Sequence, residues 1–199
     1  MSIKFKLYPE KAVQVAAAFL KQSGAVINST SLLKLIYIAD RKSFNDFGTS
    51  LTTDRYVSMQ MGPVASVIYD LIEHDEHHSD SEALKIWSEH ISPRDLNYDV
   101  RLIKDPGDGE LCEDEDAIIQ DVYAKFGHLT WDKLVDYVHK FPEWQDPQND
   151  PLHRKSIPLS IEDILNALNK PDQEIQAIQA DAAREYYLDS VLQNAYQYI

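Results

Sequence analysis

Three histidines lie close together in the stretch EHDEHH, residues 73–78. His74 and His78 are four residues apart, as are Glu73 and His77. Side chains at this spacing lie on one face of a helix, where they can bind the same metal ion. The sequence offers no second cluster of His, Cys, Asp or Glu with metal-binding spacing. We therefore interpret the histidines as a solvated, fraying helix end, and we expect no metal site.

The sequence contains no pattern for nucleophilic catalysis. It has no G-x-S-x-G motif, and nothing pairs a particular serine with a particular histidine. The carboxylates of DGELCEDEDA, residues 108–117, could serve acid–base chemistry only if one were buried, whereas their density predicts solvation near a helix N-terminus. We expect no catalytic residue and no cofactor; the rival enzyme hypothesis is a metal-dependent hydrolase built on the three histidines.

Gly62 and Pro63 pose a choice between a ligand-binding loop and the start of a helix. The apolar residues that follow have helical spacing: Val64, Val67, Ile68, Leu71 and Ile72. This spacing predicts Pro63 at the first helical position and Gly62 at or beside the cap. A phosphate-binding loop needs several glycine amides that converge on the ligand, and one glycine followed by proline does not supply them.

Asp40 and Arg41 lie on a predicted helix whose apolar residues cover most of its circumference. Asp40 is three and four residues from Tyr37, Ile36 and Phe44, so it borders a face that we expect to be buried. A carboxylate in such a place must be paired or hydrogen-bonded. Asp40 is therefore either a structural residue of the core or part of a site.

Aromatic and methionine side chains gather around the same elements: Tyr37, Tyr56, Met59, Met61 and Tyr69. Tyr69 falls outside the apolar stripe of its helix, beside Ala65, which predicts an exposed ring. Exposed side chains of these types suit a protein interface, in which methionine repacks against different partners. The alternative interpretation is that they belong to an ordinary core.

The chain has 199 residues, one cysteine and a formal net charge of −14. A single cysteine excludes an intrachain disulfide and indicates a reducing compartment. There is no apolar run of the roughly 20 residues that span a membrane and no signal-peptide core at the N-terminus, so we expect a cytoplasmic protein. The charge opposes unassisted binding to nucleic acid or to an anionic membrane and favours a basic protein partner.

Periodicity and caps predict a mainly α (α+β) fold. The predicted helices cover residues 9–23, 29–47 with a cap at Ser29, Thr30 or Ser31, 63–73, 115–126, 131–141, 161–169 and 172–199. Residues 55–61 read as an extended segment. Residues 82–90 and 96–103 alternate loosely, which predicts a β-hairpin or two sheet strands. The proline-rich residues 142–158 are expected to wander over the surface.

The long last helix is predicted to carry an apolar stripe beside several tyrosines. The stripe consists of Leu188, Val191, Leu192, Ala195 and Ile199, and the tyrosines are Tyr186, Tyr187, Tyr196 and Tyr198. Such a helix either seals the core or forms a dimer or toxin interface.

Residues 27–72 resemble the Panacea domain, also called the SocA-like antitoxin domain. The family pattern is a KLLKLLYFAD helix, a G-x-P/S-L turn, an extended segment and GPV-x-S-x-Y. The matching residues are Lys34, Leu35, Tyr37, Ala39, Asp40, Gly48, Leu51, Met59, Gly62, Pro63, Val64, Ser66 and Tyr69.

A second stretch, residues 114–144, resembles the later helices of the family. The matching residues there are Phe126, Gly127, Leu134, His139, Pro142 and Trp144. The likeness covers most of residues 9–150. It implies a Panacea domain over residues 1–155 and a C-terminal helical extension, residues 156–199, that packs on the domain or serves as an interface.

The resemblance implies an antitoxin of bacterial and phage toxin–antitoxin pairs, which neutralises a cognate toxin by direct binding. The alternative implied by SocA itself is an adaptor that delivers the toxin to an AAA+ protease. We expect the partner-binding surface around the C-terminus of the 29–47 helix, the extended segment and the GPV start. Its candidate residues are Tyr37, Asp40, Arg41, Tyr56, Met59, Met61, Gly62, Pro63 and Tyr69.

Overall fold

The computed structural model describes the backbone of residues 7–196 and the side chains of residues 7–184, 187 and 188. Within this range the helices are α1 (Pro9–Gln22), α2 (Ser29–Phe47), α3 (Ser66–Glu73), α4 (Ser81–His90), α5 (Glu113–Phe126), α6 (Trp131–Val138), α7 (Ile161–Ala167) and α8 (Asp172–Tyr196). The strands are β1 (Val26–Asn28), β2 (Tyr56–Met59), β3 (Gly62–Ala65), β4 (Asp99–Arg101) and β5 (Ser156–Leu159). The predicted fold class, mainly helical with small sheets, is confirmed.

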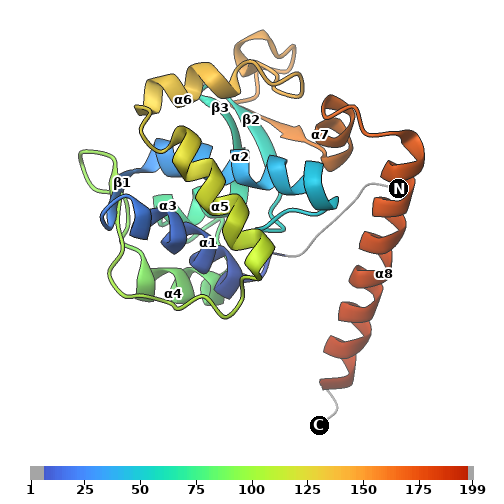
Figure 1. Ribbon diagram of the computed structural model, residues 1–199, viewed down its shortest axis with the longest axis horizontal. Helices are drawn as coiled ribbons and strands as arrows, with labels where there is room; N and C mark the ends of the chain where they lie inside the picture. Colours follow the sequence, from blue (N-terminus) through green and yellow to red (C-terminus); the bar gives the residue numbers. More distant parts are fainter. Residues whose placement is uncertain (1–6, 197–199) are drawn as a thin grey trace.

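Helix α2 forms the centre of the molecule, and α1, α5, α6 and α7 all contact it (Figure 1). This position explains why apolar residues surround most of its circumference. Its N-cap is Asn28, whose side chain accepts hydrogen bonds from the amides of Thr30 and Ser31, so the predicted cap at residues 29–31 was slightly late. Gly48 ends the helix with a φ of +75°, a left-handed conformation that glycine adopts readily.

A three-stranded antiparallel sheet with the order β3-β2-β5 lies beside α2. Met59 of β2 pairs with Gly62 of β3 on one side and with Ser156 of β5 on the other. The prediction that residues 142–158 wander over the surface was therefore wrong for their last part, because β2 offers β5 a strand edge. The division at residue 155 stays a prediction, but the sheet continues beyond it.

The prediction that Pro63 begins a helix was wrong. Gly62–Ala65 is strand β3, and α3 begins at Ser66. Val64 fits the helical spacing only by coincidence, because the short turn between Met59 and Gly62 folds this segment back onto β2.

The prediction of strands over residues 82–90 was also wrong, because this segment is helix α4. Its N-cap is Asp80, whose side chain accepts hydrogen bonds from the amides of Glu82 and Ala83. The second predicted strand, within residues 96–103, exists as β4, but it pairs with β1 near the start of the chain. Its partner is too far away in sequence for a local pattern to reveal.

The later helices lie close to their predicted positions. Helix α5 ends at Phe126, and α7 begins after Ser160, whose hydroxyl accepts a hydrogen bond from the amide of Asp163. Trp131, at the first turn of α6, is 47% exposed.

Helix α8 leaves the body of the molecule, and its second half extends away from it (Figure 1). Near its start Ile175 is buried, and Ile178 packs beside Gly48. Tyr187 and Leu188 are more than half exposed. The other predicted stripe and tyrosine side chains lie outside the described residues: Tyr186, Val191, Leu192, Ala195, Tyr196, Tyr198 and Ile199. In the part of the chain that the structure describes, no helix is both long enough and apolar enough to span a membrane.

Candidate functional site

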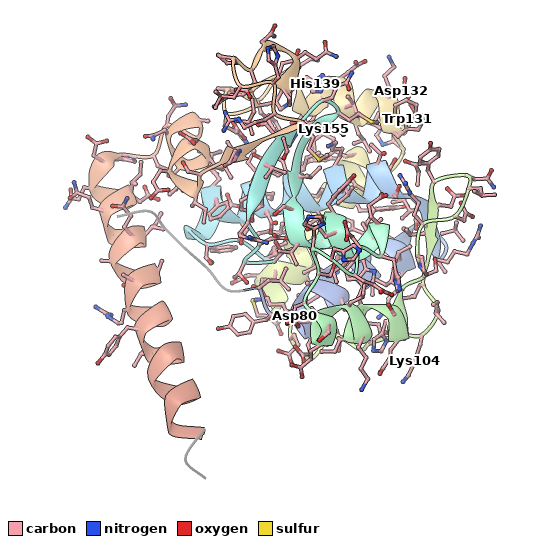
Figure 2. All side chains as sticks on the ribbon, turned by 180° about the vertical axis from the view of Figure 1, so that it is seen from behind. Asp80, Lys104, Trp131, Asp132, His139 and Lys155 are labelled. Atoms are coloured by element: carbon pink, nitrogen blue, oxygen red, sulfur yellow. The ribbon has the colours of Figure 1, made fainter. Side chains whose placement is uncertain are left out.

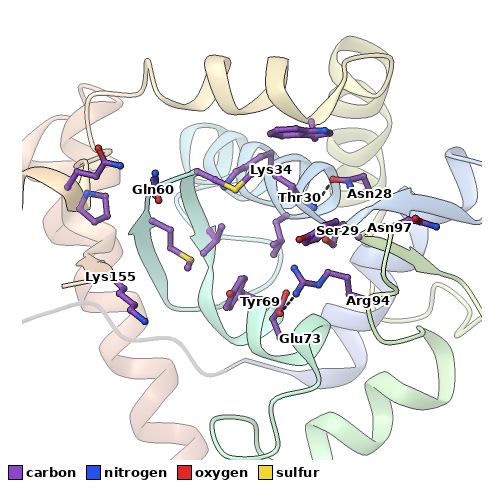
Figure 3. A pocket seen from close by; sticks show the side chains of 18 of the residues that line it. Asn28, Ser29, Thr30, Lys34, Gln60, Tyr69, Glu73, Arg94, Asn97 and Lys155 are labelled. Atoms are coloured by element: carbon purple, nitrogen blue, oxygen red, sulfur yellow. Dashed lines mark hydrogen bonds and ion pairs between the residues drawn. The ribbon is translucent and has the colours of Figure 1, made fainter. Parts of the chain in front are cut away.

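A cavity of about 750 Å³ opens between α2, the β2–β3 turn, α3 and the segment that precedes β5 (Figure 3). This volume is typical of sites that bind a small ligand or a few side chains of a partner. The start of α2 supplies Leu33 and Lys34, the turn supplies Met59 and Met61, and α3 supplies Tyr69. The cavity therefore combines elements from widely separated parts of the chain.

Gly62 allows the β2–β3 hairpin to approach α6 closely. Its φ is +98°, and a Cβ atom built at this position would lie 2.5 Å from Cγ2 of Val138 and 3.4 Å from Nζ of Lys34. A side chain would thus be strained in its backbone and would clash with α6. The glycine that the sequence suggested as a helix cap instead leaves room for a buried ammonium group.

Lys34 is 1% exposed, although it lines the cavity (Figure 3). Its Nζ donates a hydrogen bond to the carbonyl oxygen of Pro63 at 3.0 Å. No carboxylate among the described residues forms an ion pair with it. Burial lowers the pKa of Lys34 to about 7, because the charged form loses its hydration.

The rim of the cavity exposes large aromatic and sulfur-containing side chains. Met61 is 41% exposed, Trp131 47% and Tyr98 56%. Trp131 lies at the end of the molecule that also carries His139 and Lys155, whereas Asp80 and Lys104 lie at the other end beside α4 (Figure 2). Exposed aromatic and methionine side chains are enriched at protein interfaces.

Basic side chains outnumber acidic ones in the cavity wall. Arg94 is paired with Glu73 at 2.7 Å, and Arg154 is paired with Asp150 at 2.9 Å, whereas no such pair with a described carboxylate is formed by Lys34 or Lys155. The wall is therefore locally cationic in a chain whose formal net charge is −14.

Asp40 is 1% exposed and forms the centre of a buried hydrogen-bond network. Its carboxylate accepts hydrogen bonds from the amide and hydroxyl of Thr52, at 3.0 and 2.6 Å, and from the hydroxyl of Tyr56 at 3.0 Å. Burial raises the pKa of Asp40 to about 6, against the opposing effect of these hydrogen bonds. The network ties α2 to the segment that leads into β2.

Asp54 was missed by the sequence analysis. Its carboxylate accepts hydrogen bonds from the amides of Val67 and Ile68 at 3.0 and 2.9 Å, so it caps the first turn of α3 from a distant part of the chain. Burial raises the pKa of Asp54 to about 7. No local signal identified this residue, because N-cap patterns relate neighbours in sequence.

Arg41 joins a second buried network through Glu143. The guanidinium Nε lies 2.7 Å from Oε1 of Glu143, which also accepts a hydrogen bond from Tyr37 at 3.1 Å. The guanidinium also lies over the ring of Phe141, at 4.3 Å. Glu143 was missed, because the proline-rich segment that contains it was expected to lie on the surface.

The structure separates the predicted partner-binding residues into two groups. Tyr37, Asp40 and Tyr56 are buried in the core, and the partly buried Arg41 is paired with Glu143, so this group supports a surface. Met59, Met61 and Tyr69 line the cavity. Pro63 and Gly62 contact Lys34: the Pro63 carbonyl accepts its hydrogen bond, and Gly62 leaves room for its Nζ. Tyr69, which was predicted to be exposed, is only partly so.

The histidine cluster forms no compact set of ligands. His74 ends α3 in a left-handed conformation, and Nδ1 of His78 lies 2.7 Å from a carboxylate oxygen of Asp75. Among the described residues, no group of three or more His, Cys, Asp or Glu side chains is arranged to hold a metal ion.

Residues 32–145, more than half of the chain, match the family model described as antitoxin SocA-like, Panacea domain. The chain therefore belongs to the SocA-like Panacea family, as the sequence motifs had indicated. Searches of the curated proteins and of the solved structures found no match. Part of the cavity wall, from residues 28–30 and 147–155, lies outside the matched range.

Proposed function

We propose that the protein is an antitoxin that neutralises a cognate toxin by direct binding, and that the cavity and its rim form the contact surface. Membership of the SocA-like antitoxin family supports the class of function. The observation that carries the choice of surface is the exposed set of Met61, Tyr98 and Trp131 around a large cavity.

This surface has the features of a binding hot spot. Aromatic side chains supply a large contact area and lose little conformational entropy, and methionine adapts its shape to a partner. The core networks centred on Asp40 and Glu143 hold the supporting elements in place. The proposal therefore assigns the protein a binding role, in which the partner buries the rim and fills the cavity.

The test is co-expression with the product of the neighbouring gene, followed by measurement of binding with the purified proteins. We expect the wild-type chain to rescue growth and to bind the toxin, and Trp131→Ala to weaken binding by about tenfold or more, as hot-spot truncations do. Phe47→Ala is the matched control, because Phe47 is 52% exposed at the opposite end of α2 from the cavity. Equal affinities of the two variants would contradict the proposed surface.

Neutralisation by direct binding does not depend on an AAA+ protease, whereas delivery of the toxin for degradation does. Direct neutralisation persists in a strain that lacks the protease, and the toxin stays abundant in the complex. If rescue disappears in that strain and the toxin is degraded in its presence, the protein acts as an adaptor. The toxin-binding surface would be required in both cases.

A further inference from the structure

We propose that the cavity receives an acidic, partly apolar segment of the toxin, and that a carboxylate of this segment binds Nζ of Lys34. The inference rests on the proposed antitoxin function and adds the chemistry of the bound segment. It starts from the charge of the cavity wall, which is opposite in sign to the net charge of the whole chain.

Lys34 carries the argument because its ammonium group is buried without a compensating anion. An ammonium has three N–H donors, and the hydrogen bond that the structure gives Nζ is the one to the Pro63 carbonyl. A buried ammonium that lacks a counter-ion is costly, which is why the pKa of Lys34 falls to about 7 and a bound carboxylate would favour its protonated form. A carboxylate at the cavity floor would form a charge-assisted hydrogen bond with the remaining donors.

The other cations of the cavity also favour a negatively charged ligand, but the two arginines among them already have carboxylate partners. Arg94 and Arg154 already have carboxylate partners in Glu73 and Asp150, which hold their guanidinium groups at the wall. Lys155 is exposed and adds a positive charge to the wall (Figure 3). An acidic segment would thus meet positive charge at the exposed Lys155 and at the buried Lys34.

The apolar part of the wall explains why the segment should not be acidic alone. Leu33, Met59 and Val64 line the cavity next to Lys34. A neighbouring aliphatic or aromatic side chain of the toxin would bury apolar surface there and would exclude water from the ion pair. The expected occupant is a segment in which Asp or Glu, or a C-terminal carboxylate, lies beside an apolar residue.

The decisive variant is Lys34→Met, whose unbranched side chain is one atom shorter than that of lysine and carries no charge. We expect it to bind the toxin at least tenfold more weakly than wild type, with no loss of thermal stability, so that misfolding cannot explain the result. Lys104→Met, at the far end of the molecule, is the control for removal of one lysine and should bind like wild type. Wild-type affinity of Lys34→Met for a toxin that the parent protein binds would overturn this inference and leave the proposed function intact.

Overlapping peptides that cover the toxin sequence then locate the segment. In the peptide that binds, replacement of one Asp or Glu by its amide should weaken binding to the wild-type protein but not to Lys34→Met. Additive effects of the two changes would contradict a direct contact between the groups.

If the wild-type protein binds no toxin, the proposed function fails, and the cavity is tested by itself. The probes are the acetylated, amidated tripeptides Leu-Asp-Leu and Leu-Asn-Leu, followed through the amide NMR signals of the β2–β3 turn. The Asp peptide should shift these signals in wild type more than the Asn peptide does, and neither peptide should do so in Lys34→Met. Equal shifts with both peptides, or none with either, would refute the carboxylate site.

Discussion

Lys34 is expected to lower the stability of the folded protein while it provides a binding group. Its pKa is about 7 in the folded chain and about 10.5 when the side chain is solvated. Below pH 7 both states carry the proton, and the folded state bears the full cost of a buried charge. Between pH 7 and 10.5 only the unfolded chain binds the proton, so this group makes stability rise with pH.

Lys34→Met should therefore stabilise the protein, and most strongly at acidic pH. We expect the free energy of unfolding to increase by on the order of 2 kcal/mol at pH 6, and the gain to shrink as pH rises above 7. Asp40 and Asp54 also titrate with shifted pKa values, but they do so in both proteins and cancel in the difference. Urea denaturation at pH 6, 7.5 and 9, with Lys104→Met as control, measures the effect. A gain that does not depend on pH would show that packing, not charge, is responsible.

At the residue scale, the sequence revealed a buried carboxylate on a strongly patterned helix and missed buried carboxylates in segments that have no such pattern. Asp40 was identified because its position on the helix showed a buried carboxylate. Asp54 and Glu143 were missed because they lie in segments between helices, where no apolar periodicity marks a buried position. Their partners lie 13 and 14 residues away for Asp54, and 102 and 106 residues away for Glu143. Such long-range hydrogen bonds leave no spacing rule in the sequence.

At the element scale, the helices that carry regular apolar spacing and clear caps were predictable, because both signals are local. The strands were harder to predict from the sequence, because β1 and β5 are short and pair with strands that are distant in sequence. Strand β3 was missed although its partner is adjacent, since the apolar residues after Gly62 also fit a helix. In α4, Leu84 and Trp87 are buried with helical spacing, but the loose alternation around them was misread as a strand.

Helix α8 provides a prediction for a whole element. Among its described side chains, burial is confined to Ile175 and Ala182, with Ile178 packed against the body near Gly48. A chain that ends at Lys170 should remain soluble and folded, with its free energy of unfolding reduced by about 3 kcal/mol, the value of one or two buried isoleucine side chains. Circular dichroism melting and light scattering after gel filtration test this expectation.

Loss of association in the truncated but folded chain would make α8 a dimer or toxin interface. The matched variant is Leu188→Ser in the full chain, because Leu188 is 53% exposed and its replacement leaves the contacts of Ile175 unchanged. If both proteins associate like wild type, the helix has no interface role. An insoluble truncated chain would instead show that α8 is needed to seal the core.

At the scale of the whole molecule, the negative net charge should affect the rate of association with the toxin, and the positive charges of the cavity should affect the rate of dissociation. The formal net charge of −14 acts over long distances and favours the approach of a basic toxin, whereas the cations of the cavity act after contact. Glu113, Asp114 and Asp116, in the first turn of α5, contribute to the acidic surface and do not line the cavity.

The kinetics of complex formation should therefore separate the two effects. Raising the salt concentration from 0.05 to 0.5 M should slow association by roughly tenfold or more and change dissociation little, because salt screens exposed charges more than buried pairs. Neutralising Glu113, Asp114 and Asp116 to their amides should likewise slow association. Lys34→Met should accelerate dissociation and leave the salt dependence of association intact.

Surface plasmon resonance with immobilised toxin measures both rates. Association that salt does not affect would contradict a basic toxin, and faster dissociation of the acidic-surface variant would place that surface inside the interface.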